Sequence, residues 1–364
     1  MKKFLVIQTA FIGDVVLSTA LLASLHEKYP EAQIDFLVRK GNETLLKGHP
    51  YIHEVLVWNK KENKYLNGFR ILKKIRSTKY DAVLNVQRFA ATGLFTAFSK
   101  ATLRIGFDKN PFSFLFTHVI KHIQLAKGVH EIDKNHLLLS PLGEFPKCKP
   151  TLYLTPSDLD AVKKYQVAPY ICMAPASVWF TKQFPVNQWV NFINNIPFNG
   201  PIYLIGGPGD TNLLNAIIEE LHLTQNCQHH QGQIHNNDQD QNNDQDQLND
   251  LHEKKLKVIS LAGKLSFLES AALQKQAVMN YVNDSAPMHF ASAVNAPVTA
   301  IYCSTIPDFG FGPLSDQSFI VETKEQLACK PCGLHGKKAC PLGHFNCAQT
   351  IQLEQLILPI SKMA

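Results

Sequence analysis

Short apolar runs alternate with amphipathic stretches through the first half of the chain. Each run has five or six residues, and polar or glycine-bearing segments separate one run from the next. Strands buried on both faces of a parallel sheet have this continuous apolar character, and the crossovers between them are usually helical. The pattern predicts strands at 4–8, 34–38, 54–58 and 81–86 and helices at 14–28, 42–48 and 67–78.

The same alternation restarts in the second half, after a proline-bearing stretch at 142–156 that is typical of a linker. Two doubly wound α/β halves would enclose a cleft, and ligands of such sheets bind beyond the carboxyl ends of the strands. Candidate site residues are therefore sought at strand ends. Strands are predicted at 170–175, 258–263, 277–284 and 297–303, and another begins at 202 and runs into the glycine-rich turn IGGPGD.

One segment fits neither half. Residues 224–250 contain 22 Asn, Gln, Asp or His among 27 positions and repeat the hexapeptide NNDQDQ in tandem. No apolar face can be drawn on this stretch, so burial cannot offset the entropy of ordering it. We expect a disordered surface loop. His229, His230 and His235 within it are of a residue type that binds metal ions, but nothing else in the segment indicates a metal site.

Composition restricts the class of protein. The 364 residues favour two domains, and 45% hydrophobic against 18% charged residues allows large cores. The longest apolar runs are short and interrupted, so no membrane-spanning helix is predicted. The N-terminal MKKFLVIQTAFIGD has two lysines and an apolar stretch, but Asp14 interrupts it and no small-residue cleavage site follows. We interpret it as a first strand and expect a cytoplasmic protein.

Charge is distributed unevenly along the chain. Residues 1–150 carry 23 Lys and Arg against 12 Asp and Glu, a net charge of +11, which leaves −5 for residues 151–364 out of a total of +6. The run RILKKIRSTK (70–79) concentrates five of the positive charges on a predicted helix. The first half is therefore suited to an anionic partner, such as a phosphorylated substrate or a membrane surface; a solvated basic face is the alternative.

Asp14 stands where the first strand gives way to the first helix. An acidic residue there commonly serves as an N-cap or balances the helix dipole. At the carboxyl end of a strand the same side chain would face the cleft, where it could take a proton from a hydroxyl group. The positive end of the helix is expected to lower its pKa and to weaken it as a base.

Two boxes in the second half offer ligands for phosphate. The stretch PASVWFTKQFP carries the hydroxyls of Ser177 and Thr181 and the charge of Lys182, although an ordinary surface loop would look the same. In NDSAPMHFASAV, Asp284 and Ser285 stand where a helix begins, and His289 follows one turn later. Taken singly, the first two could be an ordinary N-cap and His289 a buried structural histidine. Free N–H groups and the helix dipole favour an anion there, so we expect a diphosphate site.

The C-terminal region holds a box of cysteines with the spacing C-x2-C-x7-C-x6-C, which differs from the usual zinc-ribbon pattern. Four thiolates would suit a structural zinc ion, reduced structural thiols are expected in the cytosol, and disulfides are the third alternative. The cysteines are Cys329, Cys332, Cys340 and Cys347.

The ordered set of boxes resembles glycosyltransferase family 9, the ADP-heptose:lipopolysaccharide heptosyltransferases. The tail around CPLGH is similar to that of heptosyltransferase II-type sequences. The resemblance implies a GT-B fold of two Rossmann-like domains, with an acceptor-binding domain at 1–155, a nucleotide-sugar-binding domain at 156–348 and a C-terminal helix at 349–364. The matching stretches are IQTAFIGDVVLSTALLASL, APASVWFTKQFP, LIGGPGD, LAGKLSFLESAAL and NDSAPMHFASAVNAPVTAIY.

The resemblance also implies an activity, the inverting transfer of a heptose from an ADP-activated donor to the inner core of lipopolysaccharide, with no cofactor or metal required. Asp14 becomes the general base, presented by a tight backbone turn at Gly13. The family often has glycine where this chain has Ala286, whose methyl group would crowd the diphosphate. The donor side is implied to comprise Ser177, Thr181 and Lys182, with Asp284, Ser285 and His289 opposite and Asp210 near the nucleotide.

Expected partners are a nucleotide sugar, a lipid-linked lipopolysaccharide precursor and the anionic surface of the inner membrane, on which the enzyme would be peripheral; no nucleic acid is expected. Three alternatives remain: a family member with another nucleotide sugar or acceptor, a sugar-nucleotide 2-epimerase of the same fold, and a non-catalytic nucleotide-binding module. Asp14 separates the last from the enzymes, because transfer needs a base and binding does not.

Overall fold

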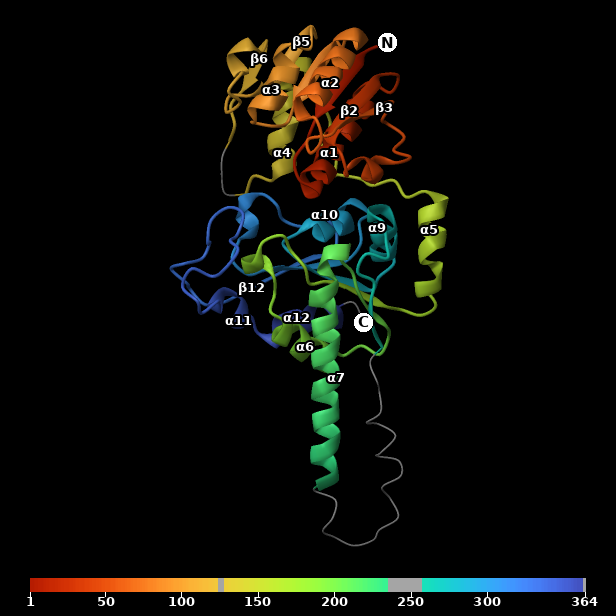
Figure 1. Ribbon diagram of the computed structural model, residues 1–364, viewed down its shortest axis with the longest axis vertical. Helices are drawn as coiled ribbons and strands as arrows, with labels where there is room; N and C mark the ends of the chain where they lie inside the picture. Colours follow the sequence, from red (N-terminus) through yellow and green to blue (C-terminus); the bar gives the residue numbers. More distant parts are fainter. Residues whose placement is uncertain (124–127, 235–256, 363–364) are drawn as a thin grey trace.

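The computed structural model describes residues 1–123, 128–234 and 257–362. Two α/β units stack along the long axis of the molecule, with the first half of the chain forming the upper unit in Figure 1 and the second half the lower. Each unit is built on one six-stranded sheet. Across the described ranges, none of the helices combines the length and the hydropathy needed to span a bilayer.

The two sheets have the same strand order. The first is β3-β2-β1-β4-β5-β6 and the second is β12-β11-β10-β7-β8-β9, which is the same order read from the opposite edge. Neighbouring strands are parallel throughout. This is the strand order of Rossmann-type sheets, so the predicted GT-B-type α/β class with two doubly wound units is confirmed. The strands are β1 (Lys3–Ile7), β2 (Gln33–Arg39), β3 (Glu54–Trp58), β4 (Ala82–Asn85), β5 (Leu103–Phe107), β6 (His118–Ile120), β7 (Ile171–Ala174), β8 (Ile202–Leu204), β9 (Val258–Ser260), β10 (Met279–Asn283), β11 (Val298–Tyr302) and β12 (Ser318–Glu322).

Helices form the crossovers between the parallel strands. The α-helices are α1 (Ile12–Lys28), α2 (Lys64–Thr78), α3 (Ala90–Ala97), α4 (Glu131–His136), α5 (Pro156–Val162), α6 (Val186–Asn195), α7 (Thr211–Ile234), α9 (Phe267–Lys275), α10 (Ala286–Ala293), α11 (Asn346–Gln349) and α12 (Leu353–Ser361). Short 3₁₀ helices are η1 (Glu43–Leu46), η2 (Ser113–Leu115), η3 (Leu137–Leu142), η4 (Lys163–Tyr165), η5 (Phe180–Lys182), η6 (Pro208–Asp210) and η7 (Pro307–Phe309).

Strand β1 shows how the apolar runs become the centre of a sheet. Successive side chains of a strand point to opposite faces, so a strand covered on both sides must be apolar throughout. Phe4 and Val6 pack into the core that includes α1, whereas Leu5 and Ile7 pack into the core beneath α2 and α3. Each fully buried side chain of this size contributes about 1.5–3 kcal/mol to stability.

The core of the first unit continues into the second. Leu268 of α9 and Phe290 of α10 belong to the same buried cluster as Val15 and Leu22 of α1. The segment before α5 also touches both units, because the Thr151 N–H donates to Thr19 Oγ1 at 2.9 Å and the Leu152 N–H donates to the carbonyl of Ala293 at 3.2 Å. The junction is thus apolar and packed.

Helix α7 corrects one prediction. The disordered loop expected at 224–250 is wrong at its start, since α7 continues to Ile234 and extends away from the second unit in Figure 1. Leu214, Ile217 and Leu221 anchor its beginning in the core. A helix nucleated this way adds residues without a new nucleation cost, and the glutamines of its continuation have good helix propensity. The rest of the predicted loop and the side chains of His229, His230 and His235 lie outside the described residues.

The other element predictions differ mainly in length. The helix expected at 42–48 is the 3₁₀ turn η1, and the C-terminal helix expected at 349–364 is α12. The sequence pattern did not predict β5, β6, β12, α3 and α4, each of which has few consecutive apolar residues. The predicted first strand at the N-terminus is confirmed as β1.

Candidate active site

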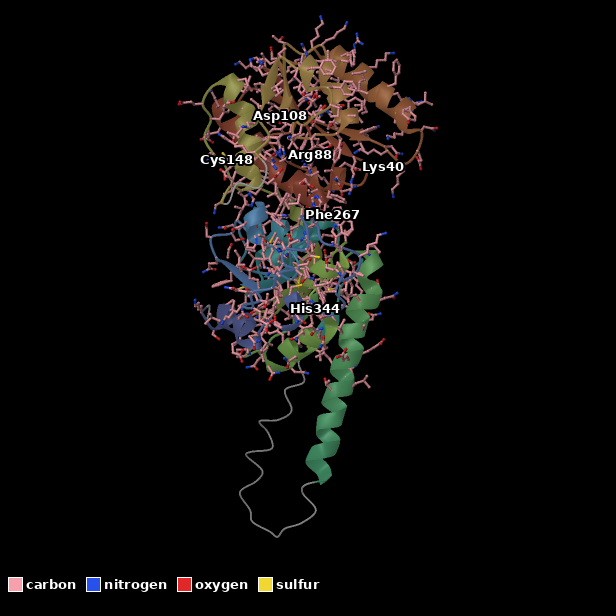
Figure 2. All side chains as sticks on the ribbon, turned by 90° about the vertical axis from the view of Figure 1, so that its left-hand side faces the viewer. Lys40, Arg88, Asp108, Cys148, Phe267 and His344 are labelled. Atoms are coloured by element: carbon pink, nitrogen blue, oxygen red, sulfur yellow. The ribbon has the colours of Figure 1, made fainter. Side chains whose placement is uncertain are left out.

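Two cavities open at the junction between the units, each lined from both. The larger, of about 580 Å³, is formed mostly by the second unit, with Ile12 and Thr44 from the first; we call it the large cavity. The smaller, of about 200 Å³, is lined by Asp14 and its neighbours, with Phe311 from the second unit; we call it the Asp14 cavity. In Figure 2, Arg88 and Phe267 lie near this junction in the first and second units.

Both cavities lie where the strand order of each sheet reverses. In the first unit the strand order reverses between β1 and β4. Asp14 follows β1, and Gln87 follows β4. In the second unit the strand order reverses between β7 and β10. Ser177 follows β7, and Ser285 follows β10. Crossovers leave such points in opposite directions, which opens a crevice for a ligand at the carboxyl ends of the strands.

Asp14 lies in the first turn of α1 and lines the Asp14 cavity, as expected from the sequence. Its pKa is raised above 3.8, because burial penalises the carboxylate more than the N–H groups near Phe11 and the cations Lys134 and Arg39 favour it. The sequence-based expectation of a lowered pKa is therefore wrong: the helix end acts in the expected direction, but desolvation outweighs it. A raised pKa makes Asp14 a stronger base when ionised.

Glu131 and Lys134 line the same cavity as Asp14, and neither was predicted from the sequence. They form an ion pair within the first turn of α4, and both line the Asp14 cavity. Burial raises the pKa of Glu131, Lys134 lowers it, and the negative charge of Asp14 raises it further. The cavity therefore holds two carboxylates that interact electrostatically, together with one lysine cation. The spacing of Glu131 and Lys134, i and i+3 before a leucine-rich run, was the available signal.

A polar network supports the rim of the Asp14 cavity. Gln87 Nε2 donates to Gln8 Oε1 at 2.6 Å, and Thr9 Oγ1 donates to Gln87 Oε1 at 2.7 Å. Lys60 Nζ donates to the carbonyl and hydroxyl oxygens of Thr9 at 2.8 and 2.9 Å. These bonds connect the two loops that follow β1 and β4 and help to hold them in place.

Gly13 has a different role from the one predicted. It lies within α1 with ordinary helical geometry, so no tight turn depends on it. A Cβ atom there would lie 2.7 Å from Cδ2 of His289, which belongs to α10 in the other unit. Glycine is required because α1 and α10 approach each other here, and the approach brings Asp14 to the junction.

The first turn of α10 presents two polar atoms without partners. Ser285, the N-cap, and His289 are four residues apart and share one side of the helix. Within the described chain, Ser285 Oγ and His289 Nδ1 are buried and make no hydrogen bond. Burial lowers the pKa of His289 to about 4, so its ring is neutral at physiological pH. Together with free backbone N–H groups, these atoms suit an anionic oxygen at the helix start.

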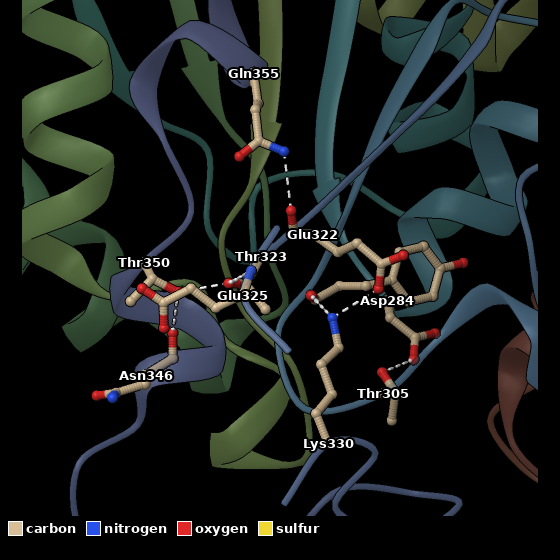
Figure 3. Close-up of polar contacts among 10 residues, drawn as sticks. Asp284, Thr305, Glu322, Thr323, Glu325, Lys330, Asn346, Thr350 and Gln355 are labelled. Atoms are coloured by element: carbon tan, nitrogen blue, oxygen red, sulfur yellow. Dashed lines mark hydrogen bonds and ion pairs between the residues drawn. The ribbon is translucent and has the colours of Figure 1, made fainter. Parts of the chain in front are cut away.

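Lys182 and Asp284, predicted on opposite sides of the donor, form an ion pair. Lys182 Nζ lies 2.7 Å from Asp284 Oδ2, and the two side chains are only 15% and 9% exposed. Thr305 Oγ1 donates to the same carboxylate oxygen at 2.6 Å, a contact seen in Figure 3. The pair places a positive charge close to the start of α10 and holds it there.

Thr181 is buried and serves the cysteine-bearing segment. Its hydroxyl accepts from the N–H of Lys337 at 2.7 Å and from Ser304 Oγ at 2.9 Å, and its own N–H donates to the carbonyl of Lys337 at 3.1 Å. Gly336 fits against it in the left-handed region, with φ of +75°. The predicted contact between Thr181 and the donor phosphates stays a prediction, and the structure places the hydroxyl in other bonds.

The cysteine-bearing segment, residues 329–347, lies over the second unit and reaches the Asp14 cavity. Lys330 Nζ lies 2.7 Å from Glu322 Oε2 (Figure 3), and the Cys332 N–H donates to the carbonyl of Ser304 at 2.8 Å. Leu334 and His335 from this segment line the Asp14 cavity. A loop far along the chain thus completes a cavity that begins at residue 8.

The cysteines of this segment are free thiols: Cys329, Cys332, Cys340 and Cys347. Among the residues that the structure describes, no group of three or more His, Cys, Asp or Glu side chains is arranged to hold a metal ion. The backbone N–H groups around Leu342 and Phe345 lower the pKa of Cys340, whereas burial raises the pKa of Cys347 to about 11.

The remaining predicted residues line the large cavity: Ser177, Asp210, Ser285 and Ala286. Asp210 Oδ2 accepts from the N–H of Gly207 at 2.7 Å and so closes the glycine-rich turn after β8. Ser177 receives a long hydrogen bond of 3.4 Å from the N–H of Trp179. The structure thus collects residues from several sequence boxes around one cavity, while Asp14 lines the adjacent one.

Comparisons with known proteins place this geometry in context. Residues 68–229 and 223–342 match the family model described as Glycosyltransferase family 9 (heptosyltransferase). Lipopolysaccharide heptosyltransferase 3 of Escherichia coli is 26% identical over 309 residues, which cover 81% of this chain and 82% of that protein.

Solved structures agree in fold. A glycosyltransferase family 9 protein from Veillonella parvula DSM 2008 superposes with a TM-score of 0.77 at 18% identity, covering 100% of this chain and 97% of the other. ADP-heptose lps heptosyltransferase II of E. coli superposes with a TM-score of 0.73 at 19% identity, covering 100% and 98%.

Proposed function

Because the chain belongs to glycosyltransferase family 9, the heptosyltransferases, and is a glycosyltransferase, we propose that it transfers a heptose from an ADP-activated donor to the inner core of lipopolysaccharide. Transfer inverts the configuration of the anomeric carbon, since a single displacement by the acceptor hydroxyl attacks from the side opposite the departing ADP. The heptosyltransferases among its relatives and the two adjacent cavities support the proposal.

The large cavity takes the donor in this proposal. Its volume of about 580 Å³ is within the usual range for small-molecule sites, and apolar residues such as Leu261 and Leu265 offer a surface for a nucleotide base. The start of α10, with Ser285 Oγ and the helix N–H groups, receives the diphosphate. Ala286 lies at this wall, so its methyl group faces the ligand where the family often has glycine.

Asp14 acts as the general base. Burial keeps its pKa above the ordinary value, which strengthens the carboxylate as a proton acceptor. The acceptor hydroxyl loses its proton to Asp14 as its oxygen bonds to the anomeric carbon. The position of Asp14 in a cavity that adjoins the donor residues is the observation that carries the proposal.

Lys182 serves the departing ADP. Negative charge develops on the β-phosphate as the glycosidic bond forms and the donor bond breaks, and a fixed cation and N–H dipoles stabilise it without a proton donor. Asp284 holds Lys182 in place through the 2.7 Å ion pair. We propose that the reaction needs no metal, because Lys182 and the N–H groups at the start of α10 stabilise the leaving diphosphate.

The acceptor occupies the Asp14 cavity. Arg88, Lys134, His122 and His335 around it provide positive or neutral donors for the acidic sugars and phosphates of a lipopolysaccharide core. The first half of the chain has a net charge of +11, which favours an anionic acceptor and the anionic cytoplasmic face of the inner membrane. We therefore propose a peripheral enzyme at that membrane, facing the cytoplasm.

A transfer assay tests the proposal. Purified protein is incubated with ADP-heptose and a delipidated inner-core oligosaccharide, with EDTA present; mass spectrometry measures addition of one heptose, and NMR coupling constants give the anomeric configuration. The Asp14→Asn variant is the control for chemistry. A product from the parent and none above about 1% from the variant are expected. Equal rates for both would remove Asp14 from the mechanism, and binding of ADP without transfer would indicate a nucleotide-binding module.

A further inference from the structure

Large apolar side chains are exposed together on α2, α3 and η2. Tyr65 is 86% exposed, Phe69 69% and Phe114 77%. Single exposed apolar residues are ordinary, but a group of them on neighbouring elements marks a surface that meets something apolar. The residues of this surface, which we call the α2–α3 patch, are Tyr65, Leu66, Phe69, Leu94, Phe98, Phe114 and Leu115.

The helix register explains why these side chains point outward. Gly68 and Ile75 are the buried residues of α2, and Gly68 packs against Trp58 and Phe95, which would lie 3.6 and 3.7 Å from a Cβ atom there. Tyr65 and Phe69, four residues apart, lie beside each other on the flank of that buried face, where both stay exposed. Helix α2 packs against α3, and α3 packs against η2, so the elements that carry the exposed residues are neighbours; α2 and α3 lie side by side in Figure 1.

Positive charge accompanies the patch on α2. Helix α2 carries no acidic residue, and its basic residues are exposed: Lys64, Arg70, Lys73, Lys74 and Arg76. Of these, Lys74 pairs with Glu54 at 3.0 Å, and in the part of the chain that the structure describes the other four make no ion pair. An apolar centre of aromatic and leucine side chains with a basic margin is the composition of elements that lie in the interface of an anionic bilayer.

We propose that the α2–α3 patch inserts into the interfacial layer of an anionic lipid bilayer and that its basic margin binds the lipid headgroups. The inference rests on the proposed function, because a lipid-linked acceptor gives the enzyme a reason to remain at a membrane. It adds to the electrostatic attraction of the basic half an apolar contact that salt does not screen. An acidic protein is the other partner that this surface could take, and vesicles of pure lipid distinguish the two.

The position of the patch relative to the Asp14 cavity supports this proposal. Phe89, the N-cap of α3, is exposed and lines the Asp14 cavity together with Arg88. Helix α3 has eight residues, so it spans about 12 Å from that cavity rim to Phe98 in the patch. A sugar attached to a membrane lipid would therefore reach Asp14 while its acyl chains stay in the bilayer.

Flotation with vesicles of phosphatidylglycerol and phosphatidylethanolamine tests the proposal at low and high salt. The parent is expected to float at both. Tyr65→Gln/Phe69→Gln should lose the salt-resistant binding by about tenfold or more, since two large apolar side chains no longer leave water. Arg70→Glu/Lys73→Glu should lose mainly the salt-sensitive part. Leu358→Gln, an exposed apolar position on α12 in the other unit, is the matched control and should float like the parent.

A fluorescent variant locates the contact. Phe69→Trp should show a blue-shifted emission with these vesicles and quenching by brominated acyl chains. The positions are exposed, so equal melting temperatures for all variants are expected and exclude unfolding as a cause. Floating of Tyr65→Gln/Phe69→Gln at high salt like the parent, an unshifted emission from the Phe69→Trp variant, or no binding of the parent to pure lipid would each overturn the proposal.

The two proposals fail in different ways. Transfer to a delipidated acceptor without vesicles depends on the proposed function alone, and Tyr65→Gln/Phe69→Gln should retain it fully. Loss of transfer to a full-length lipid acceptor in vesicles, with transfer to the delipidated acceptor intact, supports the docking surface. Equal transfer by the variant and the parent to the vesicle-bound acceptor would contradict it, while an inactive parent that still floats would contradict only the proposed function.

Discussion

The ring of His289 fills the space that a side chain at position 13 would need: its Cδ2 lies 2.7 Å from the Cβ position of Gly13. The two residues belong to α1 and α10, one in each unit. Gly13 directly precedes Asp14, and His289 lies one turn beyond Ser285. The contact therefore joins the proposed base to the proposed diphosphate site and sets how closely they approach.

Gly13→Ala tests this contact. The added methyl group collides with a buried ring, so we expect a loss of about 1–3 kcal/mol in the free energy of unfolding, measured by urea denaturation. The displaced junction should also lower turnover. His289→Ala in the Gly13→Ala background should recover stability relative to Gly13→Ala, with His289→Ala alone as the reference. Strictly additive losses in the double variant would show that the two side chains do not compete for the same space.

Asp14 links activity to pH. Its folded pKa is raised above 3.8, and the base must be ionised, so kcat/KM should fall as pH falls through that raised value. Burial favours the protonated carboxyl group, so protonated Asp14 stabilises the folded protein. This contribution is complete below the pKa that Asp14 has in the unfolded chain and is lost as pH rises through its pKa in the folded protein. At neutral pH, Asp14→Asn should therefore raise the melting temperature while lowering turnover by about 10²-fold or more. A lower melting temperature at neutral pH would contradict burial as the dominant effect.

Lys182→Met should weaken ADP binding by about 1.5–3 kcal/mol, the value of a charge-assisted contact, measured by calorimetry. It also leaves the largely buried Asp284 without its cation, which should destabilise the protein by about 3–5 kcal/mol. Lys182→Met/Asp284→Asn removes both charges and should restore much of the stability, but not the ADP affinity. Recovery of affinity together with stability would mean that Lys182 acts on the fold alone.

Thr181→Val should release the cysteine-bearing segment. The substitution removes the hydroxyl that accepts from the Lys337 N–H and from Ser304, which should cost about 1–3 kcal/mol because those donors are left unpaired. His335 should then lose its position in the Asp14 cavity, raising KM for the acceptor more than Kd for ADP. His335→Ala, which leaves the bonds of Thr181 intact, should reproduce the change in KM without the loss of stability.

Deleting residues 226–250 should leave the melting temperature and transfer activity nearly unchanged. The side chains of α7 that pack in the core, Leu214, Ile217 and Leu221, all precede the deletion. Calorimetric melting and the transfer assay measure the outcome. Loss of folded protein on deletion would show that this polar segment contributes to structure.

Much of the fold could be predicted because it depends on local pattern. The run FLVIQ is apolar at all but its last position, which suits a strand covered on both faces, and β1 is that strand. Repetition of the pattern after residue 156 predicted a second sheet of the same kind. Asp14, Ser177 and Ser285 could be placed near a cleft because they follow strands, and parallel strands end at one edge of a sheet.

What the sequence by itself determined, then, is the order of most strands and helices and the residue types at strand ends, since these follow from neighbours a few positions apart. Only the tertiary structure decided how those residues act. The pKa of Asp14 rises because distant segments exclude water from it. Glycine is needed at position 13 because α10 packs against α1. The hydroxyl of Thr181 accepts a hydrogen bond from a segment more than 150 residues away. Burial, close approach and long-range hydrogen bonds depend on contacts between remote parts of the chain, and local patterns carry no record of them.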